Sequence, residues 1–107
     1  FASAMASAMI PSVAQMMAVL GSSPSDEILV QAMHYLKLYI QRIYKENDLH
    51  VIGPAYAAVG KVKDIYRQVI YLKHEDYQVL VRIKDQLEKY IEINSGFRNI
   101  YIQFDFS

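Results

Sequence analysis

The sequence predicts an all-α protein, an antiparallel four-helix bundle with an extended aromatic C-terminal tail. Three observations favour this fold class. Apolar residues recur at three- and four-residue spacings along most of the chain, which is the period of an amphipathic helix. Proline stands near three of the expected helix starts. The 107 residues, 53% of them hydrophobic, are enough for a single domain, residues 1–107, to bury one core.

The first helix is expected over residues 9–20. Pro11 suits the first turn of a helix, because its missing N–H has no partner there in any case. Gly21 ends the pattern and the turn follows it. The apolar residues at helical spacing are Met9, Val13, Met16 or Met17, and Leu20.

The second helix is expected over residues 24–46. Ser23 can cap its N-terminus, Pro24 occupies the first helical position, and Asp26 completes a capping box in place of the usual Glu. Such an arrangement satisfies backbone N–H groups that the first helical turn leaves without partners. Its apolar stripe comprises Leu29, Met33, Leu36, Ile40 and Ile43.

The third helix is expected over residues 54–72, where Gly53-Pro54 again places a proline at a helix start. Gly60 lies inside this segment and costs about 1 kcal/mol relative to alanine, which a close approach of two helices would explain. The apolar stripe of the segment comprises Ala55, Val59, Val62, Tyr66 and Val69.

The fourth helix is expected over residues 75–94. Glu75 and Asp76 would lie in its first turn, where negative charge interacts favourably with the helix dipole. Lys84 and Glu88 are four residues apart, so they would form an ion pair on the outer face.

The tail, residues 97–107, has a different period. Ile100, Ile102, Phe104 and Phe106 alternate with other residues, which is typical of a strand. A single strand has no pairing partner in an all-α protein, so we expect an extended tail that lies against the bundle.

Composition excludes several classes of protein. The net charge is 0, which argues against a nucleic-acid partner bound through the charge of the whole domain. The absence of cysteine excludes a disulfide framework and a cysteine-based zinc site, and it fits a cytoplasmic location. The charge-free start is interrupted by Pro11 and lacks a basic flank, so we expect neither a membrane span nor a signal peptide.

No constellation of residues points to catalysis. His34, His50 and His74 are scattered and have no metal-ligand spacing, and the chain contains no nucleophile elbow or phosphate-binding glycine loop. We therefore expect no enzyme, no cofactor, and no catalytic or metal-ligating residue.

One local charge bias suggests a binding surface. Lys63 and Arg67 would share a face of the third helix at a four-residue spacing. This basic strip could contact an acidic partner or the surface of a membrane, or it could be an ordinary solvated helix face.

Several short motifs resemble one family. The stretch 25–101 is similar to the immunity proteins of pediocin-like bacteriocins, in particular the enterocin A immunity group. The residues that carry the resemblance are Ser25-Asp26-Glu27-Ile28-Leu29, Tyr35-Leu36-Lys37-Leu38, Gly53-Pro54, Glu75-Asp76-Tyr77-Gln78 and Ile93-Asn94-Ser95-Gly96-Phe97-Arg98. The first helix departs from the family, whose members usually carry charges there.

The resemblance implies a function and a partner. It implies a cytoplasmic bundle, either free in the cytosol or at the inner face of the membrane. The bundle would protect a bacteriocin producer by binding the complex of the peptide with its receptor, the mannose phosphotransferase permease. Specificity in the family is associated with the C-terminal half. The candidate partner-binding residues are therefore Phe97, Arg98, Tyr101, Phe104 and Phe106, with Lys63 and Arg67 as a weaker pair. The alternative is a structural or assembly subunit that self-associates through the charge-free start.

Overall fold

The computed structural model describes residues 15–107, apart from the side chains of residues 58–62. Strands and helices alternate along this part of the chain, and a short 3₁₀ turn, η1 (Ser95–Phe97), precedes the last strand. The elements are β1 (Gln15–Ser23), α2 (Asp26–Ile43), β2 (His50–Val62), β3 (Ile65–His74), α3 (Tyr77–Ile93) and β4 (Tyr101–Phe106).

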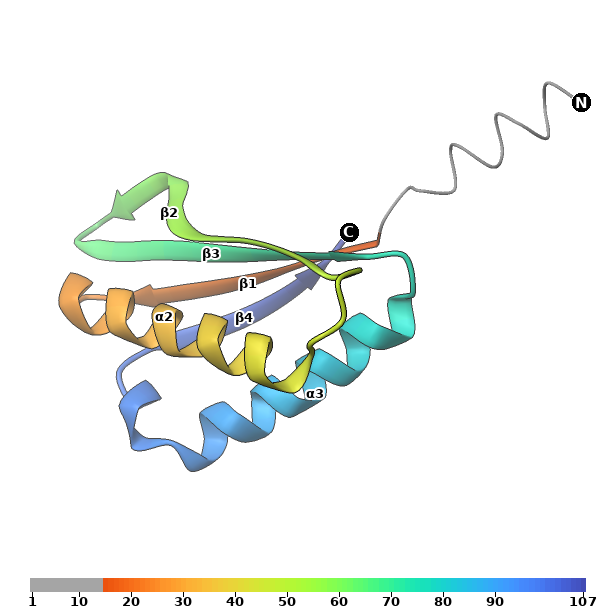
Figure 1. The fold of residues 1–107 in the computed structure, drawn as a ribbon. Coiled ribbons are helices and arrows are strands. Elements are labelled where there is room, and N and C mark those ends of the chain that lie inside the picture. The colour runs from red at the N-terminus through yellow and green to blue at the C-terminus, as the bar shows by residue number, and fades with distance from the viewer. Residues whose placement is uncertain (1–14) are drawn as a thin grey trace, which may run out of the picture.

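The four strands form one antiparallel sheet in the order β2-β3-β1-β4. Both helices lie on the same side of this sheet, so the domain has two layers (Figure 1). The order β-α-β-β-α-β, with the first and third strands in the middle, is the split βαβ arrangement called ferredoxin-like.

The expected four-helix bundle is therefore wrong. Residues 54–72 form most of β2 and β3 instead of a third helix. The described part of the first expected helix, residues 15–20, lies in β1, and residues 9–14 lie outside the described residues. The expected extended tail is strand β4 with the 3₁₀ turn before it, and β4 pairs with β1.

The hairpin β2–β3 explains the largest error. Residues 59–72 are rich in valine, isoleucine and tyrosine, which favour strands because they pack well on a pleated surface. Lys63 and Asp64 form the turn with φ angles of 52° and 65°. A two-residue hairpin turn needs such angles to match the twist of its strands, and Asn-Gly is its usual sequence signal. That signal is missing here, and the apolar residues of segment 54–72 recur by chance every three or four positions, which is also the pattern of a helix.

The second and fourth expected helices are confirmed as α2 and α3. Ser25, not Ser23, caps α2, and its Oγ accepts a hydrogen bond from the N–H of Ile28 at 3.4 Å. In α3 the cap is Asp76, whose carboxylate accepts from the N–H of Gln78 at 2.9 Å. The expected ion pair between Lys84 and Glu88 forms at 3.0 Å.

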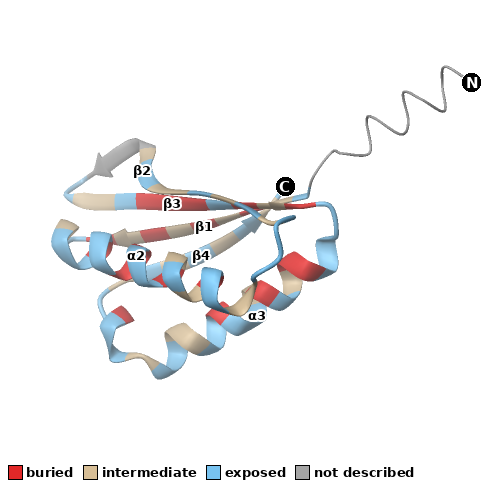
Figure 2. Ribbon diagram, viewed as in Figure 1, coloured by how far each residue is buried: buried red, intermediate tan, exposed pale blue. Residues whose placement is uncertain are grey.

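The hydrophobic core fills the space between the sheet and the helices (Figure 2). Each fully buried aliphatic side chain stabilises such a core by about 1.5–3 kcal/mol. The side chains without any exposed area come from the two central strands and both helices. They are Met17, Val19, Leu29, Met33, Leu36, Ile40, Ile70, Leu72, Leu80 and Leu87.

Candidate functional site

The face of the sheet opposite the helices, which we call the open face, is the candidate site. In β1, Met17 and Val19 point to the helices and have no exposed area, whereas the alternate residues Ala18 and Leu20 are only half-buried. Successive side chains of a strand point to opposite faces, so this alternation marks one covered and one uncovered face. In the described part of the chain, no helix lies over the uncovered one (Figure 1).

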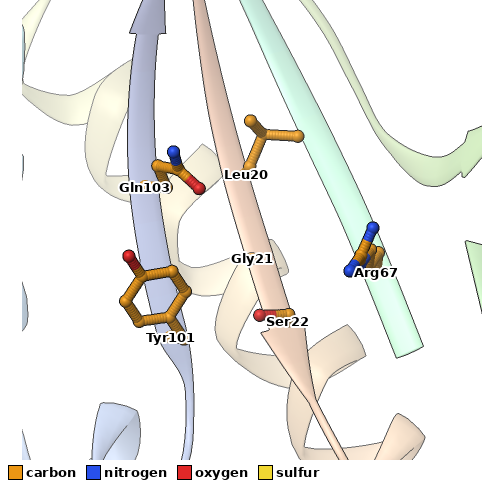
Figure 3. Close-up of a pocket in the computed structure, with 6 residues that line it drawn as sticks. All are labelled: Leu20, Gly21, Ser22, Arg67, Tyr101 and Gln103. Atoms are coloured by element: carbon orange, nitrogen blue, oxygen red, sulfur yellow. The ribbon is translucent and has the colours of Figure 1, made fainter. Parts of the chain in front are cut away.

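One row of side chains crosses three strands at one end of the open face. Ser22 in β1 is the register partner of Arg67 in β3 and of Tyr101 in β4. Neighbouring strands are about 4.8 Å apart, so Arg67 and Tyr101 stand roughly 10 Å from each other with the small serine between them. Figure 3 shows the resulting hollow, whose volume is about 220 Å³. Its lining is completed by Leu20, Gly21 and Gln103.

The hollow combines an aromatic ring with positive charge. Tyr101 is 66% exposed, which is unusual for so large a side chain, and Arg67 is also exposed. No carboxylate belongs to the lining. The hollow therefore suits a ligand that has a flat ring to stack on Tyr101 and a negative charge to meet the guanidinium.

The other end of the open face is more apolar. Ile52 in β2 is opposite Tyr71 in β3, and Tyr71 is opposite Ala18 in β1. Ile52 is 49% exposed and Tyr71 is 37% exposed. Asp105 ends this row in β4, so the only carboxylate of the row lies at the sheet edge, away from the hollow.

Three of the candidate residues named from the sequence meet at one end of the sheet. Arg67 and Tyr101 line the first hollow, and Arg98 lines a second hollow that also includes Tyr101. The expected helical strip of Lys63 and Arg67 is wrong, because Lys63 lies in the β2–β3 turn and Arg67 lies in β3. Strand pairing through Ser22 places Arg67 and Tyr101 in one row, and Arg98 lies three residues before Tyr101 in the chain.

The three phenylalanine candidates lie against the core instead. Phe97 is buried, and its ring makes an edge contact with that of Tyr90 at a centroid distance of 5.7 Å. Phe104 and Phe106 are half-buried beside α3, where the ring of Phe106 lies 5.1 Å from that of Tyr77. These side chains stabilise the packing of β4 and η1 and do not contribute to the hollow.

Sequence reasoning missed four residues of the hollow, which are Leu20, Gly21, Ser22 and Gln103. Ser22 appeared to be part of a turn after a helix, although it lies inside β1. The strand period that was recognised in the tail is the signal that could have identified Gln103, because it places Tyr101, Gln103 and Asp105 on one face.

A cluster of titratable side chains lies away from the open face. The carboxylate of Asp48 accepts a hydrogen bond from the Tyr44 hydroxyl at 2.6 Å and lies 3.1 Å from His74 Nε2. The bond to Asp48 raises the pKa of Tyr44 to about 12, and the bond from Tyr44 lowers the pKa of Asp48. The other ring nitrogen of His74, Nδ1, accepts from the Asp76 N–H at 2.8 Å. Because His74 is buried and both nitrogens have partners, we interpret this cluster as a clasp between the end of α2 and the start of α3.

The described residues contain no group of three or more potential metal ligands. None of the helices in this part of the chain combines the length and the apolar character that crossing a bilayer would require.

Comparisons with known proteins give the fold but no function. No family model matches the chain, and no curated protein matches it. Among solved structures, the chain is similar to a protein described as "De novo designed protein Foldit4", with a TM-score of 0.65 and 12% sequence identity. The match covers 88% of this chain and 96% of that one. At this identity the likeness concerns the fold alone.

The resemblance to bacteriocin immunity proteins finds no support here. It rested on helix caps and turns, and the fold that it implied is wrong because the described residues of two of the four expected helices form strands. The function is therefore argued from the open face.

Proposed function

We propose that this domain is a non-catalytic module that binds single-stranded nucleic acid on the open face of its sheet. The observation that carries the proposal is the row of Arg67, Ser22 and Tyr101 across three strands. Some four-stranded sheets with one uncovered face bind single strands by stacking bases on exposed aromatic side chains. We keep the cytoplasmic location expected from the cysteine-free sequence as part of this proposal.

The chemistry of the row matches that of a nucleotide. A base that stacks on an exposed aromatic ring contributes about 1–3 kcal/mol, and every base has a face that can do so. Arg67 supplies a guanidinium for the phosphate that follows or precedes that base. Tyr71 and Lys73 follow Arg67 on the same face of β3, so a second ring and a second positive charge lie further along the sheet.

The neutral net charge of the chain does not oppose this reading. It argued against binding through the field of the whole domain, but the structure gathers Arg67, Arg98 and Tyr101 around two hollows at one end of the sheet, and no carboxylate lines either hollow. We therefore expect modest affinity that falls with salt concentration.

The test is fluorescence anisotropy with labelled single-stranded DNA and RNA of about twelve nucleotides at low salt. Tyr101→Ala should weaken binding by about 5- to 150-fold, the equivalent of one stacked base. The matched control is Tyr35→Ala, because Tyr35 is also an exposed tyrosine but lies on helix α2. The proposal is wrong if no oligonucleotide binds, or if both variants lose affinity equally.

A second candidate function is self-association through the apolar end of the open face. Ile52 and Tyr71 are opposite one another and both are exposed, and such neighbours are typical of a protein contact. Light scattering separates the two functions. A dimer that dissociates on Ile52→Lys would favour this second candidate, whereas a monomer would remove it.

A further inference from the structure

Two hollows meet at one end of the sheet. The first contains Arg67, and the second, of about 320 Å³, contains Arg98 and Asn99. Ser22 and Tyr101 line both hollows, so the two hollows share these residues. The two hollows therefore adjoin at the end of the sheet, and we call the pair the end groove.

Each hollow of the end groove has its own arginine, and one aromatic ring is shared by both hollows. Arg67 lies in the first hollow and Arg98 in the second, and Tyr101 belongs to both. Neither arginine forms an ion pair in the part of the chain that the structure describes, and no carboxylate lines either hollow. Glu92 and Arg98 together line a separate hollow. Both guanidinium groups are thus available to an anionic ligand.

The backbone holds Arg98 firmly even though its side chain is exposed. The N–H of Arg98 donates to the carbonyl of Ser95 at 3.2 Å, and the N–H of Ile100 donates to the carbonyl of Phe97 at the same distance. The buried ring of Phe97 anchors this turn in the core. The turn therefore presents Arg98 at a constant place beside Tyr101, which lies three residues further along the chain.

We propose that a single strand of nucleic acid crosses the end of the sheet in the end groove, with one base on Tyr101 and its two flanking phosphates on Arg67 and Arg98. This inference rests on the function proposed above and assigns a path to the strand. The alternation of positive charge, ring and positive charge matches the alternation of phosphate, base and phosphate along a nucleotide chain. A phosphorylated peptide or a lipid surface offers the charge but lacks a base for Tyr101.

The number of phosphate contacts can be measured from the salt dependence of binding. For single strands, the slope of the logarithm of the association constant against that of salt concentration changes by about 0.7 for each phosphate contact. Arg67→Gln and Arg98→Gln should each reduce the slope by about that amount, and the double variant by about twice as much. Titrations of the full chain with labelled oligothymidine between about 50 and 200 mM salt provide the slopes.

Two further variants make the result specific. Arg98→Lys keeps the charge, so its slope should equal that of the unchanged chain. Arg42→Gln removes an exposed arginine from the last turn of α2, outside the end groove, and should leave the slope unchanged. All these side chains are exposed, so circular dichroism should show the same fold for every variant.

The possible results distinguish a failure of the path through the end groove from a failure of the proposed function, the binding of single strands. If no oligonucleotide binds at low salt, the proposed function itself is wrong. If oligonucleotides bind and Arg67→Gln changes the slope but Arg98→Gln does not, the module still binds single strands and the path through the end groove is wrong. Equal binding of a phosphorylated peptide, with the same loss in both arginine variants, would overturn the assignment to nucleic acid.

Discussion

The two faces of the sheet are made by the same strands and yet have opposite roles. On the covered face, Met17 and Val19 contact the helices and have no exposed area. Their neighbours on the open face, Ala18 and Leu20, remain half-buried because no second layer covers them. The comparison shows that alternate residues of β1 have different roles. Those that point to the helices stabilise the fold, and those on the open face are free to bind a ligand. Substitutions on the two faces should therefore separate folding from binding.

The largest expected effect comes from a comparison of two leucines, one in the core under the covered face and one on the open face. Leu36→Ala removes a fully buried side chain from α2 and should lower the free energy of unfolding by about 2–5 kcal/mol, since it leaves a cavity. Leu20→Ala on the open face should cost about 1 kcal/mol or less, because water already reaches that side chain. Urea denaturation measures both values. Equal losses would break the comparison, because they would mean that another molecule covers the open face in solution.

A smaller effect contrasts two adjacent residues of β1. A Cβ atom on Gly21 would lie 2.5 Å from the Sδ of Met33 and 3.2 Å from a methyl group of Leu29. Both neighbours are fully buried and cannot move aside freely, so Gly21→Ala should destabilise the fold by about 1–3 kcal/mol. Ser22→Ala, one residue later on the open face, should change stability by about 0.5 kcal/mol or less. Thermal unfolding of the pair tests this, and a stable Gly21→Ala variant would contradict the packing described.

The smallest expected effect concerns the clasp formed by Tyr44, Asp48 and His74. The Tyr44 hydroxyl lowers the pKa of Asp48, so this carboxylate stabilises the folded state above its ordinary pKa of about 3.9. The stabilisation is lost as pH falls through the lower pKa of the folded state. Asp48→Asn should therefore unfold at a lower temperature than the unchanged chain near neutral pH, and the difference should shrink in acid.

Tyr44→Phe provides the matched variant for the clasp, because it removes the hydroxyl that donates to Asp48. Its thermal unfolding should lose part of the same pH dependence, because His74 also lowers the pKa of Asp48. A difference between Asp48→Asn and the unchanged chain that stays constant from about pH 7 to pH 3 would show that the carboxylate is not the stabilising group.

The helices could be predicted because their signals are local. Ser25 and Asp76 cap helices whose apolar residues recur every three or four positions, and each of these features acts within a few residues. The cap of α2 was placed two residues early, at Ser23, because the sequence offers several capping residues in succession.

The strands could not be predicted with the same rules, because a strand is stabilised by residues far away in the sequence. The pairing of Leu20 with Val69 joins two segments that each looked helical when taken alone. The strand period after Gly96 was recognised, but without β1 as a strand it had no partner. One wrong assignment therefore produced the next.

The candidate site was found in part and for the wrong reasons. Arg67 was chosen for a helical strip, and Arg98 and Tyr101 were chosen for a resemblance whose implied fold is wrong. Arg67 and Tyr101 share a row because Ser22 pairs with both of their strands, and Arg98 lies three residues before Tyr101 in the chain. Pairing registers of that kind depend on the whole sheet.

The sequence by itself determined the two capped amphipathic helices, the strand period of the last residues and the absence of a cysteine-based site. The tertiary structure alone decided that residues 15–23 and 50–74 are strands, that one face of their sheet stays uncovered, and that Arg67, Tyr101 and Arg98 share a groove. The physical reason is the distance along the sequence between the residues that interact. Helix caps and helical periods involve residues within a few positions of each other, whereas sheet pairing brings together backbone groups from distant parts of the chain.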